Sequence, residues 1–147
     1  ASALAERING TYLEGDSFHS AANKAKMGNG TPLTDEDRWP WFDTLAEKAR
    51  ECFESDSTPV LSCSALKRAY RDRLFDGFAE PRLVYLHGDF DLIKRRMDER
   101  DHEYMTSELL RSQFSSLEVP SEDEAALQLS IEASPKELID SIVAWLA

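Results

Sequence analysis

The chain contains few of the features that would assign it to a membrane, redox or metal class. No apolar run approaches the length of a membrane span. Its two cysteines, Cys52 and Cys63, match no metal or redox spacing and are predicted to be reduced, half-buried thiols of a cytoplasmic protein. Gly28, Asn29 and Gly30 form a turn rather than a phosphate-binding loop, because no Gly-Lys-Ser/Thr follows them.

Positive charge is also scarce, since the 147 residues carry a formal net charge of −11. This balance argues against a nucleic-acid or anionic-membrane partner. Eight of the 17 Lys and Arg nevertheless fall in two short clusters. The clusters are Lys67, Arg68, Arg71 and Arg73, and Lys94, Arg95, Arg96 and Arg100. An acidic protein that gathers its cations in this way is expected to bind a small anion.

The polar segment 14–41 reads EGDSFHSAANKAKMGNGTPLTDEDRWPW. It shows neither a helical nor a strand period until its end. A long irregular stretch in a compact domain is usually functional or disordered, and the apolar anchors here argue against disorder. We interpret it as a binding loop for a small hydroxylated or anionic ligand.

The rest of the chain alternates strands with helices, which predicts one α/β domain over residues 1–147, with three layers and a mainly parallel sheet. Thr34 and Asp37 resemble a capping box, although Pro40 suggests that the regular helix begins only near that residue. The expected helices are 2–8, 35–54, 65–75 after a Ser64 cap, 90–100, 106–117, and 135–146 after a Ser134 cap; the expected strands begin at Tyr12 and cover 60–63, 83–87 and 127–133. Because a strand should feed the first helix, roughly 15–25 further residues are expected before it.

Ligands of such sheets bind beyond the carboxyl ends of the strands. The polar groups Gly15-Asp16, Ser64 with Lys67, and Gly88-Asp89 all follow strands and should converge there. Asp16 can orient or deprotonate a substrate hydroxyl, or it can cap a turn. His19 can be catalytic or structural. A zinc site from Asp16, His19 and His102 has no supporting ligand spacing, so no metal site is predicted.

Two pairs of cations repeat at a spacing of four residues. Lys67 and Arg71 would repel on one helix face, so either a protein carboxylate or an anionic ligand should compensate them. Arg96 and Arg100 could clamp phosphate oxygens, or could form a surface face paired with Asp98, Glu99 or Glu103.

Four stretches together resemble the gluconokinases, a family of small P-loop kinases. They are EGDSFHSAANKAKMGNGTPLTDEDRWPW at 14–41, CSALKRAYRD at 63–72, VYLHGDFDLIKRRMDER at 84–100 and LLRSQFSSLEVP at 109–120. The resemblance implies a fold like that of the shikimate and nucleoside-monophosphate kinases. It also implies transfer of a phosphoryl group from ATP, carried with Mg²⁺, to the 6-hydroxyl of D-gluconate.

By matching position, the resemblance also implies a role for individual residues. Asp16 would orient or deprotonate the acceptor hydroxyl. The sugar-acid pocket would be lined by His19, Lys26 and Arg38. Lys67 and Arg71 would bind the substrate carboxylate or the migrating phosphoryl group. Arg96 and Arg100 would lie in a helical lid, at about 94–120, over the ATP phosphates, and His102 would stand for the family's lid histidine.

Three positions depart from the family pattern. The loop GxxGxGKS, with its lysine and its Mg²⁺-binding hydroxyl, has no counterpart in residues 1–147, and neither has the strand before it, which lies in the middle of the family's sheet. A polypeptide that began at Ala1 is expected to bind ATP poorly. Ser20 replaces a proline, and the lid reads Asp101-His102-Glu103-Tyr104.

Two other functions fit the same residues. One is a kinase of this fold for another small hydroxylated acid such as shikimate. The other is a non-catalytic module that only binds a sugar acid. A homodimer would be compatible with an exposed Trp39 or Trp145.

Overall fold

The strands of the protein form parallel pairs. A computed structural model describes residues 1–100 and 106–147, and all strand and helix counts here refer to them. β1 (Thr11–Glu14) pairs with β2 (Pro59–Ser62), and β3 (Val84–His87) pairs with β4 (Leu127–Ser130), both in parallel register. The predicted parallel α/β fold is confirmed. Within the described residues, however, the strands make two separate pairs, so β2 and β3 each keep one edge without a partner strand.

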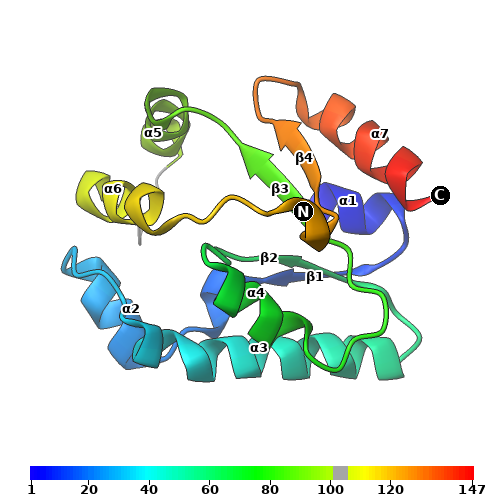
Figure 1. The fold of residues 1–147 in the computed structure, drawn as a ribbon, viewed down its shortest axis with the longest axis horizontal. Helices are drawn as coiled ribbons and strands as arrows, with labels where there is room; N and C mark the ends of the chain where they lie inside the picture. The colour runs from blue at the N-terminus through cyan, green and yellow to red at the C-terminus, as the bar shows by residue number, and fades with distance from the viewer. Residues whose placement is uncertain (101–105) are drawn as a thin grey trace.

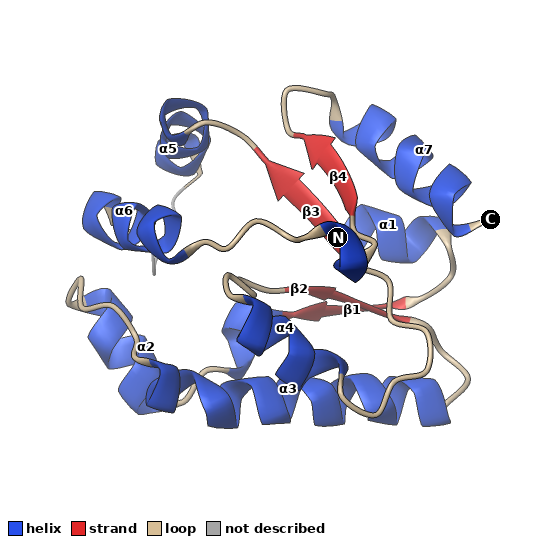
Figure 2. Ribbon diagram, in the orientation of Figure 1, coloured by secondary structure: helices blue, strands red, loops and turns tan. Residues whose placement is uncertain are grey.

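Helices cover both faces of the β1–β2 pair, which gives the three expected layers (Figures 1 and 2). α1 (Ser2–Arg7) lies on one face, and α3 (Asp35–Glu54) lies on the other beside α4 (Arg68–Phe75). α7 (Pro135–Leu146) packs against β4 and α1. None of the helices in the described part of the chain is long and apolar enough to cross a membrane.

Three further helices gather at the end of the molecule toward which β1, β2 and β3 point (Figure 1). They are α2 (Ala21–Gly28), α5 (Phe90–Glu99) and α6 (Ser107–Ser116). Short 3₁₀ turns follow β1 at Gly15–Phe18 and precede β4 at Glu122–Glu124. A ligand site at the carboxyl ends of the strands would therefore lie among α2, α3 and α6.

The main core lies between α3 and α4. Phe42 and Leu45 of α3 are completely buried and pack with Tyr70 of α4. Burial of each such side chain contributes about 1.5–3 kcal/mol. The spacing of apolar residues from Trp41 to Phe53 predicts a buried stripe on α3, which holds as far as Ala49, but the last turn leaves the core. Phe53 is therefore 71% exposed, and its predicted burial is wrong.

Helix caps decide most of the observed boundaries. The capping boxes of Thr34 with Asp37 and of Ser134 with Glu137 are both present. α3 nevertheless runs unbroken through Pro40, so the predicted late start is wrong. The proline removes one intrahelical N–H, while the box and the aromatic contacts beyond it stabilise both sides.

Three larger differences separate the structure from the sequence predictions, while other boundaries shift by about one residue. The segment 14–41 contains α2, which no prediction placed, and which begins where the Ser20 side chain accepts a hydrogen bond from the Asn23 N–H. α4 starts at Arg68 rather than Ala65, with Lys67 instead of Ser64 at its N-cap. β4 ends at Ser130, three residues early, because a turn follows.

The sequence of α7 predicts a buried face made of Leu138, Ile139, Ile142, Val143 and Leu146, and this face is also too wide. Of its apolar residues only Ile142 is fully buried, because the helix packs on a strand pair and the short α1 rather than on a broad sheet. Trp39 and Trp145 are half-buried rather than exposed, beneath the guanidinium groups of Arg73 and Arg82 respectively.

Candidate functional site

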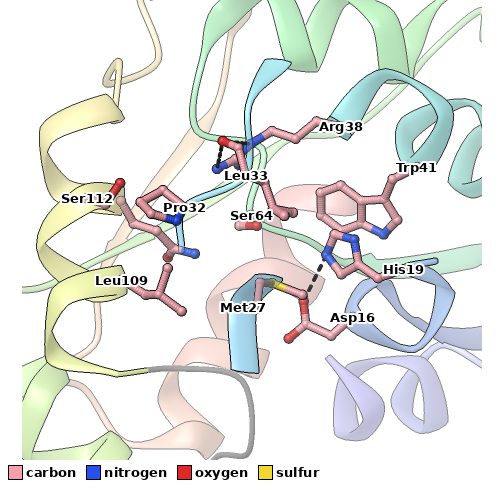
Figure 3. Close-up of a pocket in the computed structure, with 11 residues that line it drawn as sticks. Asp16, His19, Met27, Pro32, Leu33, Arg38, Trp41, Ser64, Leu109 and Ser112 are labelled. Carbon is pink, nitrogen blue, oxygen red and sulfur yellow. Dashed lines mark hydrogen bonds and ion pairs between the residues drawn. The ribbon is translucent and has the colours of Figure 1, made fainter. Parts of the chain in front are cut away.

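A small pocket, partly open to solvent, lies at the carboxyl ends of β1 and β2. Its walls come from the turn after β1, the end of α2, the start of α3 and the facing side of α6 (Figure 3). The lining residues are Asp16, His19, Met27, Pro32, Leu33, Arg38, Trp41, Ser64, Leu109, Ser112 and Gln113.

Asp16 stands in the pocket wall because β1 and β2 end very close together. A Cβ on Gly15 would lie 2.4 Å from the Ser62 carbonyl oxygen, so only glycine fits there. The Gly15 carbonyl also accepts a 2.8 Å hydrogen bond from Trp41 Nε1. These contacts fix the backbone of the residue that carries the candidate carboxylate.

His19 is buried beside Asp16. Its ring stacks on Trp41 with centroids 3.9 Å apart, and its Nε2 lies 3.9 Å from Asp16 Oδ1. Burial, followed by the charges of Arg38 and Lys24, lowers the pKa of His19 to about 4. The imidazole is therefore neutral at pH 7.

This shift makes stability depend on pH. Below pH 6.5 an unfolded His19 takes up a proton, whereas the folded side chain stays neutral until about pH 4. Stability is thus fully present above pH 6.5, and about 3 kcal/mol of it should be lost as the pH falls to 4. Urea unfolding across this range, compared with a His19→Gln variant that lacks the titrating group, measures the loss. Equal pH slopes for the two proteins would contradict the expectation.

Arg38 supplies a buried positive charge to the pocket. Its Nε and Nη2 each lie 3.5 Å from the Leu33 carbonyl, the outer limit of a hydrogen bond, and its guanidinium lies 5.3 Å from the Tyr70 ring centroid. Among the residues that the structure describes, no carboxylate forms a salt bridge with it. A buried cation without a carboxylate partner is costly, so this site favours an anionic ligand.

The two candidate lysines are paired with carboxylates of α3. Lys26 Nζ lies 2.7 Å from Asp37 Oδ2, and this contact is the main cause that lowers the pKa of Asp37 to about 2. Lys67 Nζ lies 3.3 Å from Asp35 Oδ1, which also accepts a hydrogen bond from the Tyr70 hydroxyl. Neither lysine lines the pocket, so their roles in substrate binding stay predictions.

Arg71 lies outside the pocket with its donors occupied. Its Nε and Nη2 donate to the two oxygens of Glu124 at 2.6 and 3.0 Å, and its Nη1 donates to the carbonyls of Ala65 and Leu66. The anions expected beside Lys67 and Arg71 are thus supplied by the protein itself. In this arrangement Arg71 braces the loop before α4 rather than reaching a ligand.

The other predicted site residues lie on or beyond α5. Arg96 is half-buried and Arg100 is exposed, and neither forms a salt bridge with another described residue, whereas Lys94 pairs with Asp98. Neither arginine lines the pocket. His102 lies outside the described residues. Asp89 caps α5 by accepting from the Leu92 N–H at 2.8 Å, and it does not line the pocket either.

Several lining residues carried no functional prediction. The sequence alone indicates a core residue at Trp41, a packing residue at Met27 and a helix cap at Ser64, and it assigns no individual role to Ser112 or Gln113. The last two lie within the family-like stretch LLRSQFSSLEVP, which was the available signal. Within the described residues, no three His, Cys, Asp or Glu side chains gather as metal ligands.

The parallel α/β fold, with a pocket at the strand ends that is lined by a carboxylate and a buried cation, is that of a small-molecule kinase of the P-loop type. A crystal structure of a sugar kinase from Janibacter superposes with a TM-score of 0.88 at 39% identity, covering 99% of this chain and 84% of that one. A gluconokinase from Sinorhizobium meliloti gives a TM-score of 0.84 at 35% identity, with coverages of 97% and 80%.

Curated relatives identify the family. A probable gluconokinase of mouse is 36% identical over 95% of this chain and 85% of its own length. The gluconokinase of Gluconobacter oxydans is 36% identical over 97% and 80%. No protein-family model matches the chain. The chain belongs to the gluconokinase family.

Proposed function

We propose that this protein transfers the γ-phosphoryl group of ATP to the 6-hydroxyl of D-gluconate. The observation that carries the proposal is Arg38, a buried guanidinium that lines the pocket and forms no salt bridge within the described residues. A sugar acid offers the carboxylate that such a cation needs, together with hydroxyl groups for Asp16 and His19. The relatives named gluconokinase support this choice of acceptor.

The roles of the pocket residues follow from their chemistry. Phosphoryl transfer needs positioning and charge neutralisation more than covalent chemistry. Asp16 orients the acceptor hydroxyl and receives its proton as the new O–P bond forms. Arg38 binds the carboxylate of the sugar acid. Lys26 and Lys67 are partly exposed and paired with α3 carboxylates, so they would act at the rim.

The nucleotide is proposed to lie toward α5. Arg96 and Arg100, like the neighbouring Arg95, form no salt bridge with other described residues, and this charge fits a triphosphate. Mg²⁺ would arrive bound to the phosphates, since it usually keeps several waters and few protein ligands. When bound, it would neutralise charge on the phosphoryl group.

Acceptor identity is tested by release of ADP from MgATP with a panel of acids. We expect gluconate to give kcat/KM at least about a hundredfold above shikimate, because a site built around polar groups rejects an acid that leaves them unpaired. A higher value for shikimate or another sugar acid would replace gluconate as the substrate.

Calorimetry separates the kinase from a binding module. A kinase should bind gluconate more tightly in the presence of a non-hydrolysable MgATP analogue, through reciprocal coupling between the two sites. Gluconate binding that the analogue leaves unchanged, without ADP release, would favour the module.

A cytoplasmic location is proposed from the cysteines. Cys52 and Cys63 are both free, and burial, assisted by the charge of Asp16, raises the pKa of Cys63 to about 12. A thiol held protonated in this way is inert, as expected of a structural cysteine in a reducing compartment. A homodimer stays a prediction.

A further inference from the structure

The buried side-chain amide of Asn23 contacts His19, a candidate site residue whose neutral ring can carry its proton on either nitrogen. Asn23 is 5% exposed and projects from α2 toward both His19 and the start of α3. Its Nδ2 lies 3.0 Å from the Asp37 carbonyl oxygen and 3.4 Å from His19 Nδ1. Buried polar side chains are nearly always hydrogen-bonded, so the burial of this amide depends on these two contacts.

The Asp37 carbonyl fixes which way the amide points. A backbone carbonyl only accepts hydrogen bonds, so the group that faces it must be the NH₂ of Asn23 rather than the oxygen. One hydrogen of Nδ2 goes to that carbonyl, and the other is directed at His19 Nδ1. Because Nδ1 accepts, the proton of a neutral His19 must be on Nε2.

The Nε2–H group faces Asp16. The 3.9 Å between Nε2 and Asp16 Oδ1 is too long for a hydrogen bond between them. A hydroxyl oxygen placed beside both atoms can accept from Nε2–H and donate to the carboxylate. The two side chains then define the position of one oxygen and the direction of its proton.

We propose that Asn23 is a positioning residue that holds His19 in its Nε2–H tautomer, so that His19 donates to the acceptor hydroxyl whose proton Asp16 receives. The second half of this inference rests on the proposed function. In the transfer, the hydroxyl oxygen bonds to the γ-phosphorus, the bond from phosphorus to the ADP oxygen breaks, and the hydroxyl proton goes to Asp16. Neither Asn23 nor His19 gains or loses a proton.

The decisive variant is Asn23→Asp, which keeps the shape but replaces a donor with an acceptor. A carboxylate beside Nδ1 draws a proton to that nitrogen and raises the pKa of His19. Among the described residues, the other charged groups that bear on the ring are Asp16, Lys24 and Arg38, and the variant leaves them in place. Above the raised pKa, Nδ1 keeps the proton and Nε2 becomes bare, so it can no longer donate to the acceptor hydroxyl.

Nitrogen NMR of labelled protein without substrates reads the tautomer directly. We expect the wild-type protein at about pH 7 to show a protonated Nε2 and a bare Nδ1 on His19, and Asn23→Asp at about pH 9 to show the reverse. The matched control is Asn29→Asp, the same change at the exposed C-cap of α2, which should leave the wild-type pattern. A wild-type His19 protonated on Nδ1 would overturn the proposal even if the Asn23→Asp variant failed to fold.

The pH profile tests the catalytic half. In Asn23→Asp, kcat/KM for gluconate should fall by about tenfold or more as the pH rises from about 6 to 9, relative to Asn29→Asp at each pH. Profiles that coincide for the two variants would overturn it. If the wild-type protein does not phosphorylate gluconate, the proposed function fails, and the tautomer result still decides the role of Asn23.

Discussion

Replacing Asp16 with asparagine is expected to lower kcat for gluconate by about a thousandfold, within the range typical of a lost general base. The change keeps the size and polarity of the side chain at the end of β1 but removes its ability to take the hydroxyl proton. The KM for MgATP should change little, because Asp16 lies in the acceptor pocket. Steady-state ADP release, with the melting temperature as a fold check, measures both effects.

The chain offers a matched control in Asp89→Asn. Asp89 also follows a glycine at the carboxyl end of a strand, but its side chain caps α5, and asparagine caps helices equally well. This variant should keep kcat within about threefold of wild type, because asparagine retains the helix cap and the cap takes no part in positioning the reacting groups. A kcat for Asp16→Asn within tenfold of wild type would mean that Asp16 orients the hydroxyl without receiving its proton.

Replacing Arg71 with leucine is expected to lower the free energy of unfolding by about 3–5 kcal/mol. The side chains of Arg71 and Glu124 are 3% and 7% exposed, so the change leaves a buried carboxylate without its partner. The hydrogen bonds from Arg71 also lower the pKa of Glu124, which shows that the pair stabilises the charged carboxylate. Urea unfolding measures the loss.

Arg73→Leu is the matched control for burial. Arg73 lies on the same helix as Arg71 and makes two 2.8 Å hydrogen bonds to Asp43. This pair is exposed and screened by solvent, so Arg73→Leu should lower the free energy of unfolding far less than Arg71→Leu. Removing both partners, in Arg71→Leu with Glu124→Leu, should recover part of the loss. If Arg71→Leu were as stable as wild type but had lost activity, the direct catalytic role predicted from the sequence would return.

Local signals in the sequence predicted much of the fold. Thr34 with Asp37 and Ser134 with Glu137 place two helix starts, because a capping box uses contacts within four residues. α2 escaped prediction because its buried positions are Asn23 and Met27, so a polar side chain replaces one of the apolar residues that would reveal a helical period.

The candidate site was predictable only in part. Asp16, His19 and Arg38 were identified and line one pocket. The partner of Arg71 was not identified, because Glu124 is 53 residues away and no local pattern links them. Another contact of Arg71 explains the late start of α4. Its guanidinium, rather than the N–H groups of a helical turn, donates to the carbonyls of Ala65 and Leu66.

Trp41 connects two groups in the same wall of the pocket. Its ring supports His19, and its Nε1 holds the carbonyl directly before Asp16. We therefore expect a tilt of α3 to carry both groups with it. The opposite wall belongs to α6, which packs on α5 instead (Figure 3). Movements of α6 against α3 are therefore expected to change the width of the pocket more than the separation of His19 and Asp16.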